Sequence, residues 1–181
     1  FTWSSVSATY GDANAAITAP TVGGSVAGSW SYASATNSVV AVSGSSLDFG
    51  NVGSSVVTAT FTPTDTANYV SGGTATMTVT VGQATPTFTW SNVAKTFGDA
   101  NFALSAPTVA GSVAGSWSYA SATTSVISIS GTTATVAGAG SSVVTATFTP
   151  TDTANYVSGG TVTMTVTVGQ ATPTFTWSNV S

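Results

Sequence analysis

The sequence predicts an all-β protein built from tandem β-sandwich domains of about seven strands each. One observation is an 87-residue repeat, because residues 1–87 align with residues 88–174 without a gap and match at 66 positions. The other is a period-two alternation of apolar and polar residues in short segments separated by Gly, Pro, Asn and Asp, with no helical periodicity. A repeat of this length is typical of a compact domain, whereas a solenoid coil has roughly 20–45 residues.

The repeat also predicts the domain boundaries. Phe-Thr-Trp recurs at residues 1, 88 and 175, so we expect repeat 1 at 1–87, repeat 2 at 88–174 and the start of a third repeat at 175–181. Neighbouring repeats of the same chain are therefore the first expected partners of each domain.

Sequence change is unevenly spread over the repeat. More than half of the 21 differences fall in residues 40–52 and their counterparts 127–139, whereas residues 54–74 recur unchanged at 141–161. This contrast predicts that residues 40–52 tolerate substitution, whereas the adjoining residues 54–74 are constrained.

The clearest predicted strand is Thr161–Val168, in which Thr and apolar residues alternate. Its inward face is predicted to consist of Val162, Met164, Val166 and Val168. The strand before it, Val143–Thr149, is predicted to end at Pro150, which lacks an amide donor. Its inward residues are predicted to be Val144, Ala146 and Phe148. Further strands are predicted at residues 88–94, 102–109, 116–120, 125–130 and 132–137.

Aromatic residues are expected to supply much of each core. A domain of about 90 residues buries only roughly 60–65% of its extended surface, and this chain has no Cys with which to form disulfides. Large aromatic side chains bury the most apolar area per residue. The expected core aromatics are Trp90, Trp117, Tyr119, Phe148 and Tyr156, with their copies Trp3, Trp30, Tyr32, Phe61 and Tyr69.

Three phrases of the repeat carry a resemblance to a known family. They are Tyr10-Gly11-Asp12 with its copy Phe97-Gly98-Asp99, then Val136–Gly140, then TATFTPTDTANY at Thr145–Tyr156. Together they resemble the bacterial immunoglobulin-like repeats of large surface proteins and adhesins. The first copy departs at Leu47–Asn51, where that family has a Gly-Ala-Gly turn. The resemblance implies an immunoglobulin-like β-sandwich, an extracellular or cell-surface location and a stalk of many tandem domains, with adhesion located elsewhere in the molecule.

Composition excludes several classes of function. Charged residues are 3% of the chain, and Lys95 is the single cation. Nucleic acid and anionic membrane surfaces are bound by clustered Lys and Arg, so neither is an expected partner. No run of about 18 apolar residues occurs, so we expect no membrane insertion in this segment. The absence of Cys and His removes thiol and imidazole chemistry, so we expect no enzyme, no catalytic residue and no cofactor.

Two aspartates recur in each copy, and calcium is the metal they could bind. The candidate ligands are Asp12, Asn14, Asp65, Asp99, Asn101 and Asp152. Calcium takes six to eight oxygens, usually with several carboxylates, so two Asp per copy are few. Short Asp and Asn side chains also accept hydrogen bonds from backbone amides in turns, which is the favoured interpretation. A glycosidase also needs two carboxylates, but no substrate-orienting set accompanies them here.

Three further features have both a functional and a structural interpretation. Lys95 could form an amide crosslink to Asn, but its counterpart in the first copy is Ala8, which favours a solvated Lys. The Thr ladder of Thr161–Thr167 could bind ice, yet Thr is a common solvent-facing strand residue. Asn179-Val180-Ser181 matches the glycosylation sequon.

The near-identical repeats without a reactive site predict a non-catalytic structural protein. We expect a stalk or spacer for adhesion in a long extracellular bacterial surface protein. The alternative is a self-assembling extracellular filament, sheath or virus fibre with lateral self-association. It is motivated by the low charge of the chain, because nearly uncharged faces, formed here largely by the 36 Thr and 28 Ser, pack without desolvating ions. A weaker alternative is a glycan- or ice-binding module.

Overall fold

The computed structural model describes residues 3–177, which fold into two compact units. Within these residues, unit 1 comprises 3–85 together with Ala154–Val157, and unit 2 comprises Pro86–Thr153 and 158–177. Both units are all-β, as predicted. The described part of the chain has no helix that is long and apolar enough to cross a membrane.

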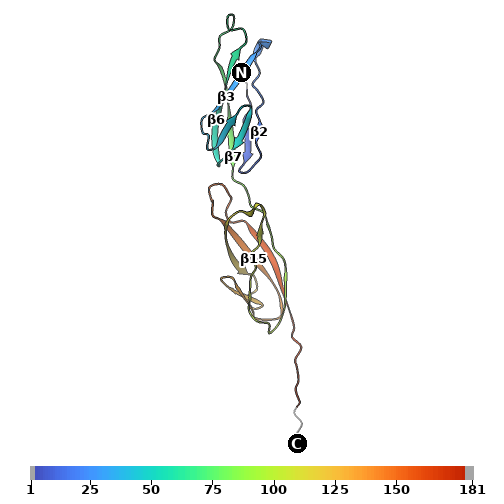
Figure 1. The fold of residues 1–181 in the computed structure, drawn as a ribbon. Coiled ribbons are helices and arrows are strands. Elements are labelled where there is room, and N and C mark those ends of the chain that lie inside the picture. The colour runs from blue at the N-terminus through green and yellow to red at the C-terminus, as the bar shows by residue number, and fades with distance from the viewer. Residues whose placement is uncertain (1–2, 178–181) are drawn as a thin grey trace. The chain divides into compact units, whose positions relative to one another are not determined.

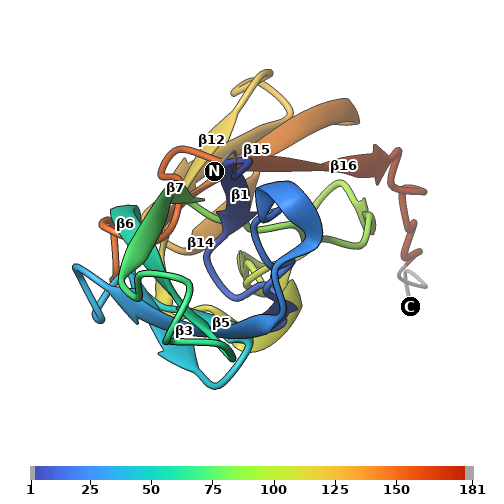
Figure 2. The ribbon, with the colours of Figure 1, turned by 90° about the horizontal axis from the view of Figure 1, so that it is seen from above.

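Unit 1 contains seven strands in two sheets (Figure 1). The order β1-β7-β6-β3 of the larger sheet can be followed in Figure 2, and the smaller sheet has the order β2-β5-β4. β1 runs parallel to β7, and the other strand pairs are antiparallel. The elements are β1 Val6–Thr9, β2 Ala15–Ala16, the 3-10 turn Gly23–Ser25, β3 Gly28–Ser34, β4 Val40–Ser43, β5 Ser46–Phe49, β6 Gly53–Pro63 and β7 Gly73–Gly82.

The core of unit 1 lies between its two sheets. Alternation along the hairpin β6–β7 turns every second residue inward, so that Val57, Val79 and Val81 are at most 1% exposed. These side chains meet Val40 and Leu47 of the smaller sheet in one cluster. Full burial of a side chain of this size contributes roughly 1.5–3 kcal/mol. Contact between the two inward faces therefore holds the sandwich together.

Unit 2 repeats this sandwich with sheets of order β12-β15-β16-β9 and β10-β14-β13, and adds the pair β11-β8. The predicted inward face of its last strand is confirmed, because Met164, Val166 and Val168 are at most 3% exposed and Val162 is half-buried. The elements are β8 Phe88–Thr89, β9 Val93–Thr96, β10 Phe102–Ala103, β11 Thr108–Val109, the 3-10 turn Ala110–Ser112, β12 Gly115–Ser121, β13 Ile127–Ser130, β14 Thr133–Val136, β15 Gly140–Pro150 and β16 Thr161–Gly169.

Two strands that the sequence predicts as continuous are interrupted in the structure. Residues 88–94 form β8 and then β9, because the side chain of Asn92 intervenes and its Oδ1 accepts the amide hydrogen of Thr165 at 2.8 Å. The chain thereby changes its partner from β11 to β16. Residues 102–109 are divided into β10 and β11 by buried Pro107, which has no amide hydrogen to donate.

A buried serine organises the start of the long hairpin in each unit. Ser142 on β15 is 2% exposed; its hydroxyl lies 2.8 Å from that of Ser121 and accepts the amide hydrogen of Thr123 at 3.1 Å. Ser55 of unit 1 is 3% exposed and makes the equivalent contacts. A buried polar group without a partner costs about 1–3 kcal/mol. Removal of one hydroxyl of a pair is therefore expected to destabilise the unit, because the other hydroxyl loses a hydrogen-bond partner.

The predicted aromatic core is correct in part. Phe61 and Phe148 are 7% and 1% exposed, and Phe148 packs on Trp117 with ring centroids 4.8 Å apart. The prediction for Tyr69 is wrong, since this side chain is 49% exposed. It lies in the loop after β6, beyond the end of the sandwich. Val, Ala, Leu, Ile and Met fill the centre instead. The half-buried members of the predicted set are Trp3, Trp30, Tyr32, Trp90, Trp117, Tyr119 and Tyr156.

Met164→Ala is expected to lower the free energy of unfolding of unit 2 by about 2–5 kcal/mol, because it removes core contacts and leaves a cavity. Its exposed neighbour provides the control, since Thr163→Ala is expected to change that free energy by less than about 0.5 kcal/mol. Urea unfolding followed by Trp fluorescence measures both. Equal effects of the two substitutions would contradict the assignment of the inward face.

Candidate functional site

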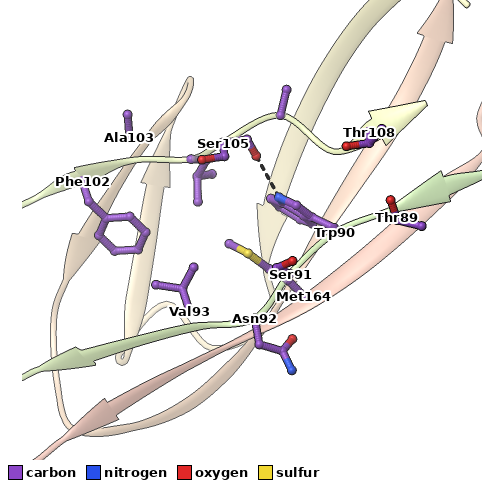
Figure 3. A pocket seen from close by; sticks show the side chains of 12 residues that line it. Thr89, Trp90, Ser91, Asn92, Val93, Phe102, Ala103, Ser105, Thr108 and Met164 are labelled. Atoms are coloured by element: carbon purple, nitrogen blue, oxygen red, sulfur yellow. Dashed lines mark hydrogen bonds between the residues drawn. The ribbon is translucent and has the colours of Figure 1, made fainter. Parts of the chain in front are cut away.

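A hollow of about 370 Å³ in unit 2 lies between β9 and the segment that carries β10 and β11 (Figure 3). Trp90 is fixed there, since its Nε1 donates to the carbonyl oxygen of Ser105 at 2.7 Å and its ring lies 5.7 Å from that of Tyr119. The residues that line the hollow include Trp90, Asn92, Phe102, Leu104, Ser105 and Met164.

Unit 1 repeats this hollow with a volume of about 360 Å³. Trp3 occupies the place of Trp90, with its Nε1 donating to the carbonyl oxygen of Thr18 at 2.7 Å and its ring 5.8 Å from Tyr32. Desolvation by burial raises the pKa of both Tyr32 and Tyr119 above the ordinary value.

The chemistry of the two hollows is limited. The residues that line them carry no ionisable side chain, and their polar groups are hydroxyls, amides and backbone atoms. The carboxamide oxygen of Asn92 is already occupied by the amide of Thr165. General acid or base catalysis needs a titratable group within hydrogen-bond reach of the reacting atom. These hollows therefore offer a recess of mixed polar and apolar lining beside a Trp ring, and no group for proton transfer.

Three of the predicted aspartates form turns. Asp12 accepts the amide hydrogen of Thr9 at 2.7 Å, and Asp99 accepts that of Thr96 at 2.9 Å. Asp65 accepts the amide hydrogen of Ala67 at 3.1 Å. These contacts agree with the interpretation of the aspartates as turn residues. The predicted neighbours Asn14 and Asn101 are exposed.

The carboxylate of Asp65 accepts three hydrogen bonds. The side chain of Asn68 donates to its Oδ2 at 2.7 Å, and the backbone amides of Asn68 and Ala67 donate to its Oδ1. The hydrogen bond from the Asn68 side chain is the largest cause that lowers the pKa of Asp65, followed by the two backbone amides. This loop is therefore organised by the ionised carboxylate.

The structure does not bring together the two aspartates of unit 1. Asp12 follows β1 at the end of β7 that carries Gly82, whereas Asp65 follows β6 at the end that carries Gly73. The ten residues of β7 separate these ends, a distance of roughly 30 Å at the rise of a strand. A glycosidase pair requires carboxyl groups about 5–9.5 Å apart. Within residues 3–177 no three Asp, Glu, His or Cys residues form a group that could hold a metal.

Lys95 of the second copy lies over an aromatic ring that the first copy lacks. Its ammonium lies 4.8 Å from the centre of the Phe102 ring, within reach of a cation–π interaction. Their counterparts in the first copy are Ala8 and Ala15, so both partners of this contact changed together. The predicted sequon at Asn179 lies outside the described residues.

The segment Ala154–Val157 packs as part of unit 1. The amide of Ala84 donates to the carbonyl oxygen of Asn155, and the amide of Val157 donates to the carbonyl oxygen of Ala84, both at 2.9 Å. The side chain of Asn155 accepts the amide hydrogen of Val52 at 2.9 Å and is 8% exposed. Backbone groups and the Asn155 side chain therefore both take part in this contact.

Side chains complete the contact. The ring of Tyr156 meets that of Tyr10 edge to face at 5.3 Å, and Gln83 Nε2 donates to the carbonyl oxygen of Ala154 at 3.2 Å. Asn155 Nδ2 donates to Asn51 Oδ1 at 3.3 Å. This contact was not predicted from the sequence, although the segment belongs to the stretch that recurs unchanged in both copies.

No family model matches the chain, and no curated protein sequence matches it significantly. Among solved structures, it is similar to surface layer protein SbsC domains 1–6, with 20% identity and a TM-score of 0.37 over 84% of this chain. The chain spans 22% of that structure. Human protocadherin-24 EC1-2 is 12% identical, with a TM-score of 0.37 over 93% of this chain and 94% of that one. Sidekick-1 immunoglobulin domains 1–5 are 11% identical, with a TM-score of 0.28 over 94% of this chain and 40% of that one.

Asn68→Ala is expected to raise the pKa of Asp65, because it removes the largest contact that favours the ionised carboxylate. In the unaltered protein this pKa lies below 3.8, so the ionised carboxylate adds stability above that pH, and the contribution is lost as pH falls through the folded pKa. Carboxyl NMR titration measures the change. An unchanged titration of Asp65 in the variant would contradict the assigned contact.

Removal of divalent cations is expected to leave the melting temperature of both units unchanged, because turn hydrogen bonds occupy Asp12, Asp65 and Asp99. A ligand that binds only the folded state must raise its stability. Calorimetry with excess calcium and with a chelator provides the comparison. A higher melting temperature in calcium would identify these aspartates as ligands instead.

Proposed function

We propose that this chain is a non-catalytic structural repeat of a long extracellular bacterial surface protein, acting as a stalk or spacer for adhesion. The observation that carries the proposal is that both units repeat the same core, the same Trp-lined hollow and the same Asp turns. Neither hollow contains an ionisable side chain. Such repetition supports a function that depends on the number of copies.

The bacterial immunoglobulin-like phrases support the extracellular part of the proposal. They recur in both units, at Tyr10-Gly11-Asp12 and Phe97-Gly98-Asp99. Each phrase forms a turn in which the Gly has a positive φ of 86° or 96° and the Asp accepts a backbone amide hydrogen of the same turn. Gly tolerates that conformation at little steric cost.

A self-assembling fibre, sheath or virus appendage is the second candidate. The outer faces of the long hairpins favour it, because they present Thr and Ser rather than ions: Thr74, Thr76, Thr78 and Thr80 of β7 are all exposed. Faces without charge associate without the desolvation cost of buried ions. A glycan- or ice-binding module is the weaker alternative, for which the same Thr ladder and the half-buried Trp residues are the candidate surface.

Electron microscopy of the intact protein at its working concentration separates these candidates. A stalk is expected to give thin single strings whose length grows in proportion to the number of repeats, because each repeat would add one domain to the string. Thick ordered filaments or tubes would contradict the stalk and assign the repeat to the building material of a fibre.

A further inference from the structure

One edge of the larger sheet in unit 2 has no neighbouring strand. β12 is the outermost strand of this sheet, and Figure 2 shows it beside β15. The two strands pair without interruption from Gly115↔Pro150 to Ser121↔Val144. No strand among residues 3–177 pairs with the other side of β12. A backbone edge of seven residues is therefore available for hydrogen bonding.

Two hydrogen bonds that flank β12 identify the backbone groups that this edge presents. The amide of Ala122 donates to the carbonyl oxygen of Val143 at 2.9 Å. The carbonyl oxygen of Ala114 accepts the amide hydrogen of Thr151, also at 2.9 Å. In an antiparallel pair, residues that exchange hydrogen bonds alternate with residues that do not. The even-numbered residues from 114 to 122 therefore bond to β15. The residues whose amides and carbonyls point away from β15 are Gly115, Trp117, Tyr119 and Ser121.

The other outer strands of this sandwich have features that oppose pairing with a further strand. The opposite edge of the same sheet is β9, which has four residues and contains Lys95. In the smaller sheet the outer strands β10 and β13 have two and four residues. Short edge strands and charged residues, Lys above all, are the means by which β proteins avoid edge-to-edge association. β12 is longer than these strands and contains neither a charged residue nor Pro.

Unit 1 has the same unpaired edge. β3 has the same seven residues as β12 and is also the outermost strand of its sheet. Unit 1 is followed by a repeat in the chain, and unit 2 is preceded by one. In neither unit does a strand of the described residues pair with this edge. The unpaired edge is therefore a property of the repeat itself.

We propose that β12 binds β12 of a second molecule of this protein as an antiparallel strand. A two-fold axis relates the two strands and passes through Ser118, the central residue of β12. Gly115 then pairs with Ser121 of the second molecule. Trp117 pairs with Tyr119 in the same way, and each pair exchanges both hydrogen bonds. In this register every outward amide and carbonyl of β12 has a partner, and the two four-stranded sheets become one continuous sheet.

The side chains of β12 suit a second copy of the same strand. On the exposed outer face, Ser118 meets Ser118 of the second molecule and Ser116 meets Ala120, so the side chains in contact are small. On the inner face the half-buried ring of Trp117 meets that of Tyr119, and aromatic cross-strand pairs stabilise a sheet. β12 contains no charged residue, so self-pairing brings no like charges together within the strand pair. These features favour a second β12 over a charged peptide as the occupant.

The inference goes beyond the proposed stalk and does not rest on it. A contact about a two-fold axis uses the same surface on both molecules and closes once two strands have paired. A stalk made of paired chains would still lengthen in proportion to the number of repeats. The contact also gives lateral self-association, the second candidate above, a defined interface.

Disulfide crosslinking tests the register, because the chain has no Cys of its own. Ser118→Cys places two thiols at a directly opposed pair whose Cα atoms are about 4.5 Å apart, within the range of a disulfide. Ser116→Cys is the matched control, since in this register its two thiols are roughly 13 Å apart along the strands. Under mild oxidation, Ser118→Cys is expected to form covalent dimers about tenfold or more faster than Ser116→Cys. Equal rates for the two variants would overturn the inference.

Two further combinations identify the occupant of the edge. An equimolar mixture of Ser116→Cys and Ala120→Cys is expected to crosslink rapidly, although each variant alone reacts slowly, because Ser116 faces Ala120 of the second molecule. The double variant Ser31→Cys/Ser118→Cys tests whether β3 of the same chain occupies the edge instead. An internal disulfide in a monomer of that variant would overturn the inference. Equal melting temperatures of all variants with reduced thiols provide the control for folding.

Hydrogen exchange tests the contact in the protein without added thiols. As protein concentration is raised, exchange at the amides of Trp117 and Tyr119 is expected to slow about tenfold or more, because pairing gives both amides an acceptor. Ser118→Lys is expected to abolish this protection, because like charges directly opposite each other destabilise a strand pair. Thr163→Lys adds the same charge at an exposed position of β16 and is expected to retain it. Exchange that is independent of concentration would overturn the inference, and thin single strings in microscopy would then leave the stalk in place.

Discussion

Each unit depends on the alternation of side chains along its long hairpin. In unit 1 the pairing runs from Gly53↔Val81 to Phe61↔Gly73 without a bulge, so the apolar residues of both strands stay on one face. A shift of one residue would move all of them to the solvent side. The second sheet, the buried serines and the parallel strand β1 all pack against positions that this register fixes. The same holds for β15 and β16.

The hairpin is also the part of the structure that the sequence predicts best. Alternation specifies which side chains face inward, as Met164 and Val166 show, because it has the period of a strand. Interruptions were harder to predict, since the break at Asn92 depends on a hydrogen bond to Thr165, which is 73 residues away. The site was predictable only as far as local chemistry reaches: the aspartate turns involve neighbours within three residues, whereas the contacts of Asn155 join distant parts of the chain.

Substitutions between the two copies compensate for one another in the smaller sheet. In unit 1, Ala15 on β2 pairs with Leu47 on β5, and at the equivalent place in unit 2 Phe102 pairs with Ala134. A small and a large side chain have exchanged places across the strand pair, and core swaps that keep volume are the ones best tolerated. Lys95 accompanies the new Phe102 ring in unit 2. The smaller sheets of the two units therefore fill equivalent space with different side chains.

Neighbouring domains of nearly identical sequence can exchange strands and misfold together. The compensating substitutions of the smaller sheet oppose such an exchange. Exchange of β5 with β14 would place Leu47 opposite Phe102 and Ala134 opposite Ala15. The first pairing puts two large side chains into space for one, and overpacking costs about 1–3 kcal/mol. The second leaves a cavity, and a large-to-small loss of this kind costs about 2–5 kcal/mol. The long hairpins differ too little to discriminate between copies, so correct pairing relies on the sequence differences of the smaller sheet.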